Sequence, residues 1–205
     1  MATQSERREA TIAALDRAAQ QLFESRGFAD TTVDDIVAKA GVAKGAFYHH
    51  YESKEAVFAK VLEGVQLAVA REVAAIASKS ADPVERLRVG LRVYIEACER
   101  PSVRRILLID GPTVLGWIRW RKIDDQFFGE MTRRTVAAAL GSRATATHIQ
   151  AVASLLAGAF AEAAMAGAAD PKLKPRDLTA AMDLLLKGLE SPAAKRRASL
   201  RSGTA

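Results

Sequence analysis

Two short helix signals separated by a glycine, in the stretch "TTVDDIVAKAGVAKGAFYHH", constrain the fold more than any other feature. Thr32 is a good helix N-cap, and Asp34 and Asp35 fall in the first turn, where the helix dipole favours acidic side chains. The apolar positions follow at helical spacing: Val33, Ile36, Val37 and Ala40. Gly41 ends this pattern, and a second short helix is predicted over residues 44–50.

Two short helices joined by a three-residue turn containing glycine form a helix-turn-helix. The predicted turn is Gly41-Val42-Ala43. Gly41 tolerates the positive φ that such a reversal usually needs, and the apolar Val42 can fill the corner between the helices. In this motif the second helix enters the major groove of DNA.

The remainder of the chain also reads as helix, because strand alternation is missing and Ala, Leu, Glu, Lys and Arg dominate. A long helix is expected from Lys54 to about Ser78, with the boundary between two units inside it. A short helix is expected to stop at Gly111-Pro112. A long one should follow over residues 113–140, loosened at Gly116 and Gly129.

Composition sets broad limits on the class of protein. The 205 residues allow one or two domains, and 49% apolar residues are enough for a real core. No apolar run is expected to reach the ~18 residues of a membrane span, and the N-terminus lacks the apolar block of a secretory signal. Cys98 is the only cysteine, so no intrachain disulfide can form, which fits a cytoplasmic location.

The charge distribution gives little support to DNA binding by bulk attraction. The net charge is +6, but residues 1–60 hold eight Lys and Arg against nine Asp and Glu. The tail after Glu190 supplies +4 without any acid. DNA binding must therefore be argued from individually placed cations rather than from the overall charge.

The stretch "TTVDDIVAKAGVAKGAFYHHYESKEAVF" resembles the DNA-binding signature of the tetracycline-repressor (TetR) family of bacterial transcriptional regulators. The preceding "AALDRAAQQLFESRGFADTTV" is similar to that family's first helix, so the resemblance covers about residues 9–60. It implies an all-α homodimer of about nine helices, with an N-terminal helix-turn-helix bundle and a larger helical ligand-binding and dimerisation domain. We expect a DNA-binding domain over 8–68, an effector-binding and dimerisation domain over 69–190, and a basic, disordered tail over 191–205.

The resemblance also implies which side chains contact DNA. They are Thr32, Lys44, Gly45, Ala46, Tyr48, His49 and Lys54. Gly45 and Ala46 would let the backbone approach the groove, and Ala46 could touch a thymine methyl. Tyr48 and Lys54 suit phosphates, whereas Lys44 and His49 are candidates for base contacts.

Other rings in the motif have plainer interpretations. Phe47 is expected in the core, and Tyr51 in the core or at its boundary. His50 is left open between a packed and a surface position. Because neighbouring residues lie ~100° apart around a helix, His49 and His50 do not converge on a metal, and no metal or cofactor is expected.

The C-terminal half has a concentration of aromatic and soft apolar residues that suits a small-molecule pocket. The candidates are Tyr94, Cys98, Trp117, Trp120, Phe127, Phe128 and Met131, although such a cluster also suits ordinary core. The helices over about 145–167 and 175–189 carry the apolar stripes that the family uses for a homodimeric four-helix bundle. The alternative is that both stripes belong to the core of one chain.

Together these features predict a cytoplasmic repressor that binds a palindromic operator and is released by an unknown small molecule. A transcriptional activator or a partner-binding adaptor on the same scaffold is the alternative. A helical enzyme would need a catalytic cluster, and none is visible: no phosphate-binding glycine loop, metal-ligand set or nucleophile elbow occurs.

Overall fold

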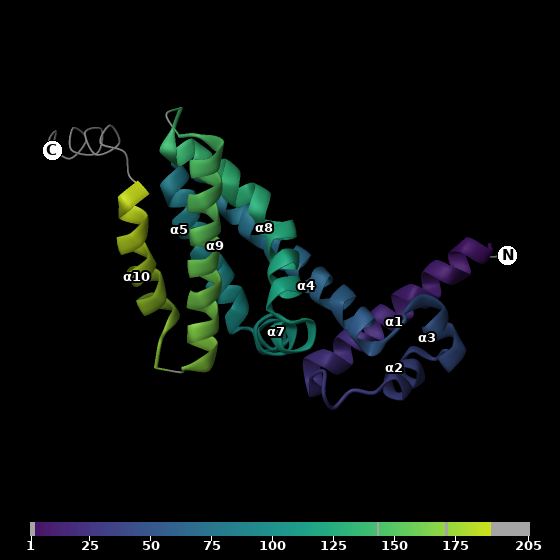
Figure 1. Cartoon of the computed structure of the whole chain (residues 1–205). Helices are drawn as coiled ribbons and strands as arrows, with labels where there is room; N and C mark the ends of the chain where they lie inside the picture. The colour runs from purple at the N-terminus through teal and green to yellow at the C-terminus, as the bar shows by residue number, and fades with distance from the viewer. Residues whose placement is uncertain (1–2, 143, 171, 190–205) are drawn as a thin grey trace, which may run out of the picture. The chain divides into compact units, whose positions relative to one another are not determined.

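The computed structural model describes residues 3–142, 144–170 and 172–189, and every regular element among them is helical (Figure 1). The elements are α1 (Gln4–Arg26), α2 (Val33–Ala40), α3 (Lys44–His50), α4 (Lys54–Ala77), α5 (Pro83–Glu99), α6 (Pro101–Arg104), a π-helical turn (Arg105–Asp110), α7 (Gly111–Leu115), α8 (Trp117–Leu140), α9 (Ala146–Ala169), α10 (Pro175–Leu186) and a 3-10 turn (Lys187–Leu189). The all-α prediction is confirmed. The tail over 191–205 lies outside the described residues.

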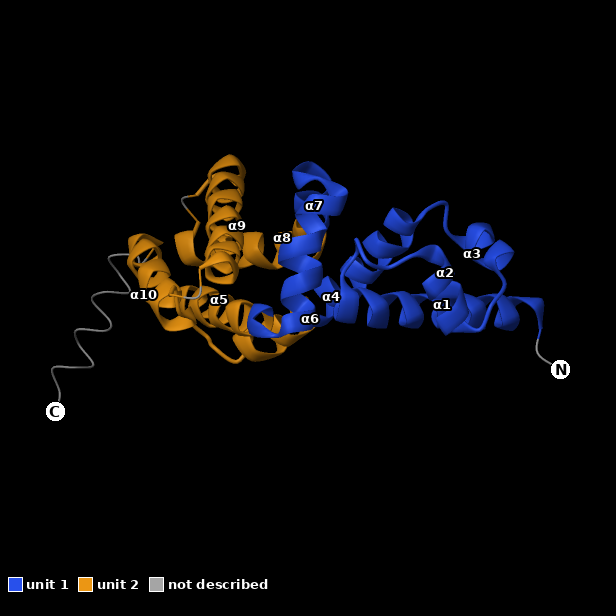
Figure 2. Ribbon diagram, turned by 90° about the horizontal axis from the view of Figure 1, so that it is seen from below, with its two compact units in different colours: residues 1–68, 98–123 blue, residues 69–97, 124–205 orange. Residues whose placement is uncertain are grey.

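The chain divides into two compact units (Figure 2). The first unit combines residues 1–68 with 98–123, and the second combines 69–97 with 124–205. The division first crosses the chain within α4. Residues 98–123 therefore group with the N-terminal helices, whereas the sequence placed them in the C-terminal domain.

Local signals set the ends of the first helices. Thr32 and Asp35 cap α2 reciprocally, since each side chain accepts a hydrogen bond from the other's backbone N–H. Gly41 follows α2 in the left-handed region with φ 68°, as the turn requires. Ser53 Oγ accepts the N–H of Ala56 at 3.2 Å and so begins α4.

The segment after Pro101 differs from the sequence prediction. The helical path does not stop at Gly111-Pro112 but continues to Leu115 and ends at Gly116, which has φ 74°. Pro112 is the second residue of α7, where its missing N–H costs little. Gly111 is buried against the side chains of Leu62 and Trp120, and a Cβ on it would lie 2.9 Å from each. The glycine is thus required by packing and does not break the helix.

The break at Gly116 also corrects the predicted helix over 113–140. Its first residues belong to α7, and α8 begins afresh at Trp117. Gly129 lies inside α8 without interrupting it.

Aromatic packing forms the centre of the first unit. The centre of the Phe23 ring lies 5.2 Å from that of Phe58 and 5.8 Å from that of Phe28. The ring centres of Phe28 and Phe58 are also 5.2 Å apart. Ile36 of α2 and Phe47 of α3 are fully buried as well. The two short helices are therefore fixed on α1 and α4 by apolar burial rather than by their own length.

The second unit contains α5, most of α8, α9 and α10. Its apolar cores are formed by Val84, Leu87, Val136, Ala153, Leu156 and Leu186, and by Leu91, Ile95, Ala163 and Met182. One helix, α9, is long and apolar enough to cross a membrane by length and composition, with a mean hydropathy of 1.5 over 18 residues. The expectation that no segment reaches this level is therefore wrong for α9.

Candidate nucleic-acid interface and ligand pocket

The helix α3 has a buried side and an exposed side. Phe47 is fully buried, as expected, and its ring packs 5.8 Å from that of Tyr51. Tyr48 is 54% exposed, and Lys44, Gly45 and His49 are exposed too. Four of the predicted DNA contacts thus lie on one accessible side of the helix, while Ala46 is half-buried.

Lys44 is held by an acidic residue of the preceding helix. Its Nζ lies 2.8 Å from Asp34 Oδ1, and both side chains are largely exposed. The hydrogen bond to Asp34 raises the pKa of Lys44, which therefore stays a cation. Because exposed ion pairs contribute little to stability, Asp34 orients the lysine without preventing it from moving to another acceptor.

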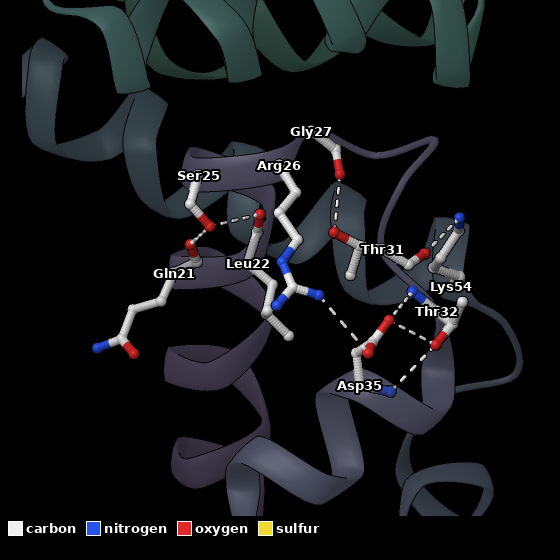
Figure 3. A network of polar contacts seen from close by, with 9 residues as sticks. All are labelled: Gln21, Leu22, Ser25, Arg26, Gly27, Thr31, Thr32, Asp35 and Lys54. Carbon is white, nitrogen blue, oxygen red and sulfur yellow. Dashed lines mark hydrogen bonds and ion pairs between the residues drawn. The ribbon is translucent and has the colours of Figure 1, made fainter.

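Thr32, a predicted backbone contact, is part of a local polar network (Figure 3). Its hydroxyl donates to Asp35 Oδ2 at 2.6 Å, and Arg26 Nη1 lies 3.6 Å from Asp35 Oδ1. The hydrogen bonds from Thr32 hold the pKa of Asp35 below its usual range. The network fixes the start of α2 against the end of α1.

The ammonium of Lys54 bonds within the first unit. Its Nζ donates to the carbonyl of Thr31 at 2.7 Å (Figure 3). It also donates to the carbonyl of Phe28 at 2.8 Å and lies 4.0 Å above the centre of the Phe28 ring. The side chain therefore ties the loop between α1 and α2 to the start of α4. Its contact with a DNA phosphate stays a prediction.

Tyr51 and His50 close the far end of α3. The Tyr51 hydroxyl donates a hydrogen bond to Asp16 of α1, and burial together with this bond raises the pKa of the phenol. The ring that the sequence placed at the core boundary thus also anchors α3 to α1. His50 is half-buried, and burial lowers the pKa of its imidazole.

Asp110, the last residue of the π-helical turn, contacts the loop that follows α1. Its Oδ2 accepts the N–H of Phe28 at 2.9 Å. The preceding Gly27 has φ 85°, and a Cβ there would lie 2.7 Å from Arg105 Nη1. The backbone conformation therefore favours glycine, whereas the end of the flexible Arg105 side chain could move away from a Cβ. Residues 105–110 are fitted closely to the end of α1.

A cavity of about 490 Å³ lies within the second unit, between α4, α5, α8 and α9. Of the predicted pocket residues, Tyr94, Phe128 and Met131 line it. The rings of Tyr94 and Phe128 meet edge to face, with centres 5.5 Å apart. The volume lies within the range of small-molecule sites, ≈ 300–1,000 Å³.

The other predicted pocket residues do not line this cavity. Trp120 is buried in the first unit, where its Nε1 donates to the carbonyl of Leu107 at 2.7 Å. Trp117 is 54% exposed beside it, with ring centres 5.1 Å apart. Cys98 is buried, and Phe127 is half-buried. A role of these four in ligand binding stays a prediction.

Family comparisons agree with this architecture. The family model described as "Bacterial regulatory proteins, tetR family" matches residues 16–61. The model described as "Tetracyclin repressor-like, C-terminal domain" matches residues 84–189, which is more than half of the chain. The chain belongs to the TetR family. The matched N-terminal region contains α2 and α3, and the C-terminal one contains most of the cavity lining.

Individual relatives are TetR-family or helix-turn-helix regulators. A crystal structure of a TetR-family transcriptional regulator from Pectobacterium atrosepticum is 31% identical, with a TM-score of 0.75 over 92% of this chain and 98% of that one. The repressor DhaR of Mycobacterium sp. (strain GP1) is 38% identical over 80 residues, 38% of this chain and 40% of DhaR. The regulator EthR of Mycolicibacterium smegmatis is 34% identical over 91 residues, 44% of this chain and 41% of EthR. The chain thus spans about two fifths of the length of these curated relatives.

The fold alone is shared with RolR, whose crystal structure contains resorcinol. That structure is 21% identical, with a TM-score of 0.73 over 95% of this chain and 94% of RolR.

The sequence did not predict several residues of the candidate DNA interface and of the cavity. Asp34 was recognised only as a dipole partner, and Asp16 was not singled out. Arg86 and Thr132 of the cavity were missed because their role depends on three-dimensional proximity. The spacing of Arg86, Gly90 and Tyr94, four residues apart on α5, was the available signal, since such residues share a helix face.

Proposed function

We propose that this protein is a cytoplasmic, homodimeric transcriptional repressor that binds a palindromic operator and leaves it when a small molecule occupies the cavity of the second unit. Residues 8–68 form the proposed DNA-binding domain, and residues 69–190 the effector-binding and dimerisation domain. Repressors among the relatives, such as DhaR, support this direction of regulation.

The exposed side of α3 is the observation that carries DNA binding. Lys44, Gly45, Tyr48 and His49 are accessible together, and Phe47 and Tyr51 hold the opposite side against the core. A seven-residue helix that is fixed in this way can enter a groove without losing its orientation. The helix has no Arg, Asn or Gln, so specificity rests on Lys44, His49, methyl contacts and DNA shape.

Homodimerisation is supported by apolar side chains that the single chain leaves uncovered. Leu155 of α9 is 74% exposed, and Leu184 and Leu185 of α10 are 68% and 62% exposed. The helices α9 and α10 are those that the family pairs across a two-fold axis. Burying these leucines in a four-helix bundle would also account for the high hydropathy of α9.

In vitro selection from random duplex DNA, followed by gel shift of the selected duplex, tests the proposal. We expect a palindrome with half-sites one helical turn apart, ~34 Å. Tyr48→Phe should weaken binding to all duplexes about equally, because it removes a phosphate contact. Lys44→Ala should relax base preference. A selection that yields no preferred duplex, from a protein that elutes as a dimer, contradicts the function.

A further inference from the structure

We propose that the cavity of the second unit binds an apolar molecule that carries one anionic group, and that Arg86 binds this group. The inference rests on the proposed function, in which this cavity is the effector site. It deepens that function by assigning the chemical class of the ligand.

The walls of the cavity select for an apolar body. Rings and aliphatic side chains from four helices face it, among them Val73, Leu87, Tyr94, Phe128 and Phe160. Burial of a ligand's apolar surface against such walls stabilises the complex by roughly 25 cal/mol per Å² removed from water. A volume of about 490 Å³ accommodates a molecule of two or three rings.

Four charged side chains also line the cavity: Arg86, Asp124, Glu130 and Arg134. Glu130 is already paired, since Arg134 Nε lies 2.6 Å from its Oε1 and Arg133 Nε lies 3.6 Å from its Oε2. These arginines, Arg134 first, hold the pKa of Glu130 below its usual range. Asp124 is buried and also has an interaction partner within the protein. Three of the four charges are thus already engaged.

Arg86 differs from the other three. Its Nε is buried and has no hydrogen-bond acceptor among the residues that the structure describes. A buried donor on a cation costs free energy until an acceptor reaches it, and a carboxylate or sulfonate is the best acceptor for a guanidinium.

The helix face that carries Arg86 continues along the cavity. Gly90 lies one turn further along α5, on the same face, and also lines the cavity. A Cβ built at position 90 would lie 3.5 Å from Val73 Cγ1 and 4.0 Å from Ala77 Cβ, so this turn packs closely against α4. Tyr94 lies one further turn along α5, and its ring also lines the cavity. An anionic group beside Arg86 and an aromatic body against Tyr94 and Phe128 fit this order.

Two fluorescent probes that differ in a single group test the assignment. The probe 8-anilinonaphthalene-1-sulfonate is anionic, and N-phenyl-1-naphthylamine is the same ring system without the sulfonate. Titration of the full-length wild-type and Arg86→Met proteins gives four affinities. We expect Arg86→Met to lower the affinity for the anionic probe about tenfold or more, because hydrogen bonds between charged groups are stronger than those between neutral groups. The affinity for the neutral probe should stay within about twofold.

Matched variants keep the result specific. Arg92→Met removes an exposed cation from the same helix, outside the cavity, and should leave both affinities unchanged. Arg86→Lys retains the charge, so its affinity for the anionic probe should lie between those of wild type and Arg86→Met. This variant keeps the proposal testable if Arg86→Met fails to fold. Ala157→Leu fills part of the cavity and should weaken both probes.

An equal effect of Arg86→Met on both probes, or none on either, overturns the proposal. So does an Ala157→Leu variant that binds the anionic probe as well as wild type does, since the probe would then lie outside this cavity. These titrations contain no DNA. Failure to select a preferred duplex would contradict the proposed function alone and leave the probe result standing.

Discussion

Gly45 offers a direct test of how closely α3 approaches DNA. It is the second residue of the helix, it is exposed, and a Cβ built on it would have no atom within 4 Å. Gly45→Ala therefore meets no steric obstacle in the free protein. Replacing an exposed helical glycine by alanine stabilises a fold by roughly 0.5–1 kcal/mol. For a chain of this length we expect the Tm to rise by about 1–4 °C.

DNA binding should respond in the opposite direction. If the backbone at Gly45 lies against the groove, the added methyl group overpacks the interface, which typically costs 1–3 kcal/mol. A dimer has two such helices, so the affinity for the selected duplex should fall by about 30-fold or more. Gel shift or fluorescence anisotropy measures the affinity, and thermal denaturation measures the stability.

Gly64→Ala is the matched control. Gly64 lies within α4, is exposed, and also has no atom within 4 Å of a built Cβ. This variant should gain at least as much stability and bind the duplex like wild type. If Gly45→Ala is stabilised and still binds within about threefold of wild type, the close approach of α3 is refuted, because 0.6 kcal/mol or less leaves no room for a steric clash.

Substitutions at three further positions test contacts within the first unit. Tyr51→Phe removes the bond to Asp16 and should cost about 1–3 kcal/mol of unfolding free energy at pH 7. Because the pKa of Tyr51 is raised in the folded state, wild type should also lose stability as the pH rises above about 10, and a denaturation series should show a smaller loss in the variant. If Lys54 mainly holds the loop between α1 and α2, Lys54→Met should lower both stability and DNA affinity. If it mainly contacts phosphate, the substitution should lower DNA affinity alone. Denaturation and gel-shift assays on the same variant separate the two outcomes. Asp110→Ala should speed hydrogen exchange of the Phe28 amide, measured by NMR, whereas Asp110→Asn keeps an acceptor oxygen and should slow it again; equal exchange rates would refute the contact.

The helix-turn-helix was predictable because its signals are local. Thr32 caps through its own neighbours, and Gly41 takes the left-handed conformation within the turn. Phe47 was placed in the core because apolar spacing on one helix decides which side faces inward. These relations span three or four residues, and a single sequence contains them.

Long-range partners were not predictable in the same way. Trp120 was assigned to the ligand pocket because of its ring, which stays a prediction, but the bond from its Nε1 to the Leu107 carbonyl could not be read from the sequence. Gly111 looks like a helix stop in the sequence, whereas its real constraint is the closeness of Leu62, 49 positions earlier. The grouping of residues 98–123 with the N-terminal helices depends on such contacts, and no local pattern reports them.

Along the chain, a segment of the first unit lies between two helices that line the cavity. The cavity-lining turns of α5 end at Tyr94, and those of α8 begin at Asp124. Between them lies the segment whose Asp110 holds the Phe28 amide, and Phe28 is also held by Lys54. This segment follows α5 after Arg100 alone and precedes α8 with only Gly116 between.

A ligand can shift the position of this segment only if it has different affinities for two states of the protein, and its effect is limited to that difference in affinity. The coupling has to be reciprocal. If 8-anilinonaphthalene-1-sulfonate weakens binding to the selected duplex by some factor, a saturating amount of the duplex must weaken the probe by the same factor. Because this equality holds for any route of coupling, the size of the factor is the test: if the probe binds the cavity and leaves the affinity for the selected duplex unchanged, occupancy of the cavity does not act on DNA binding and the proposed release is refuted.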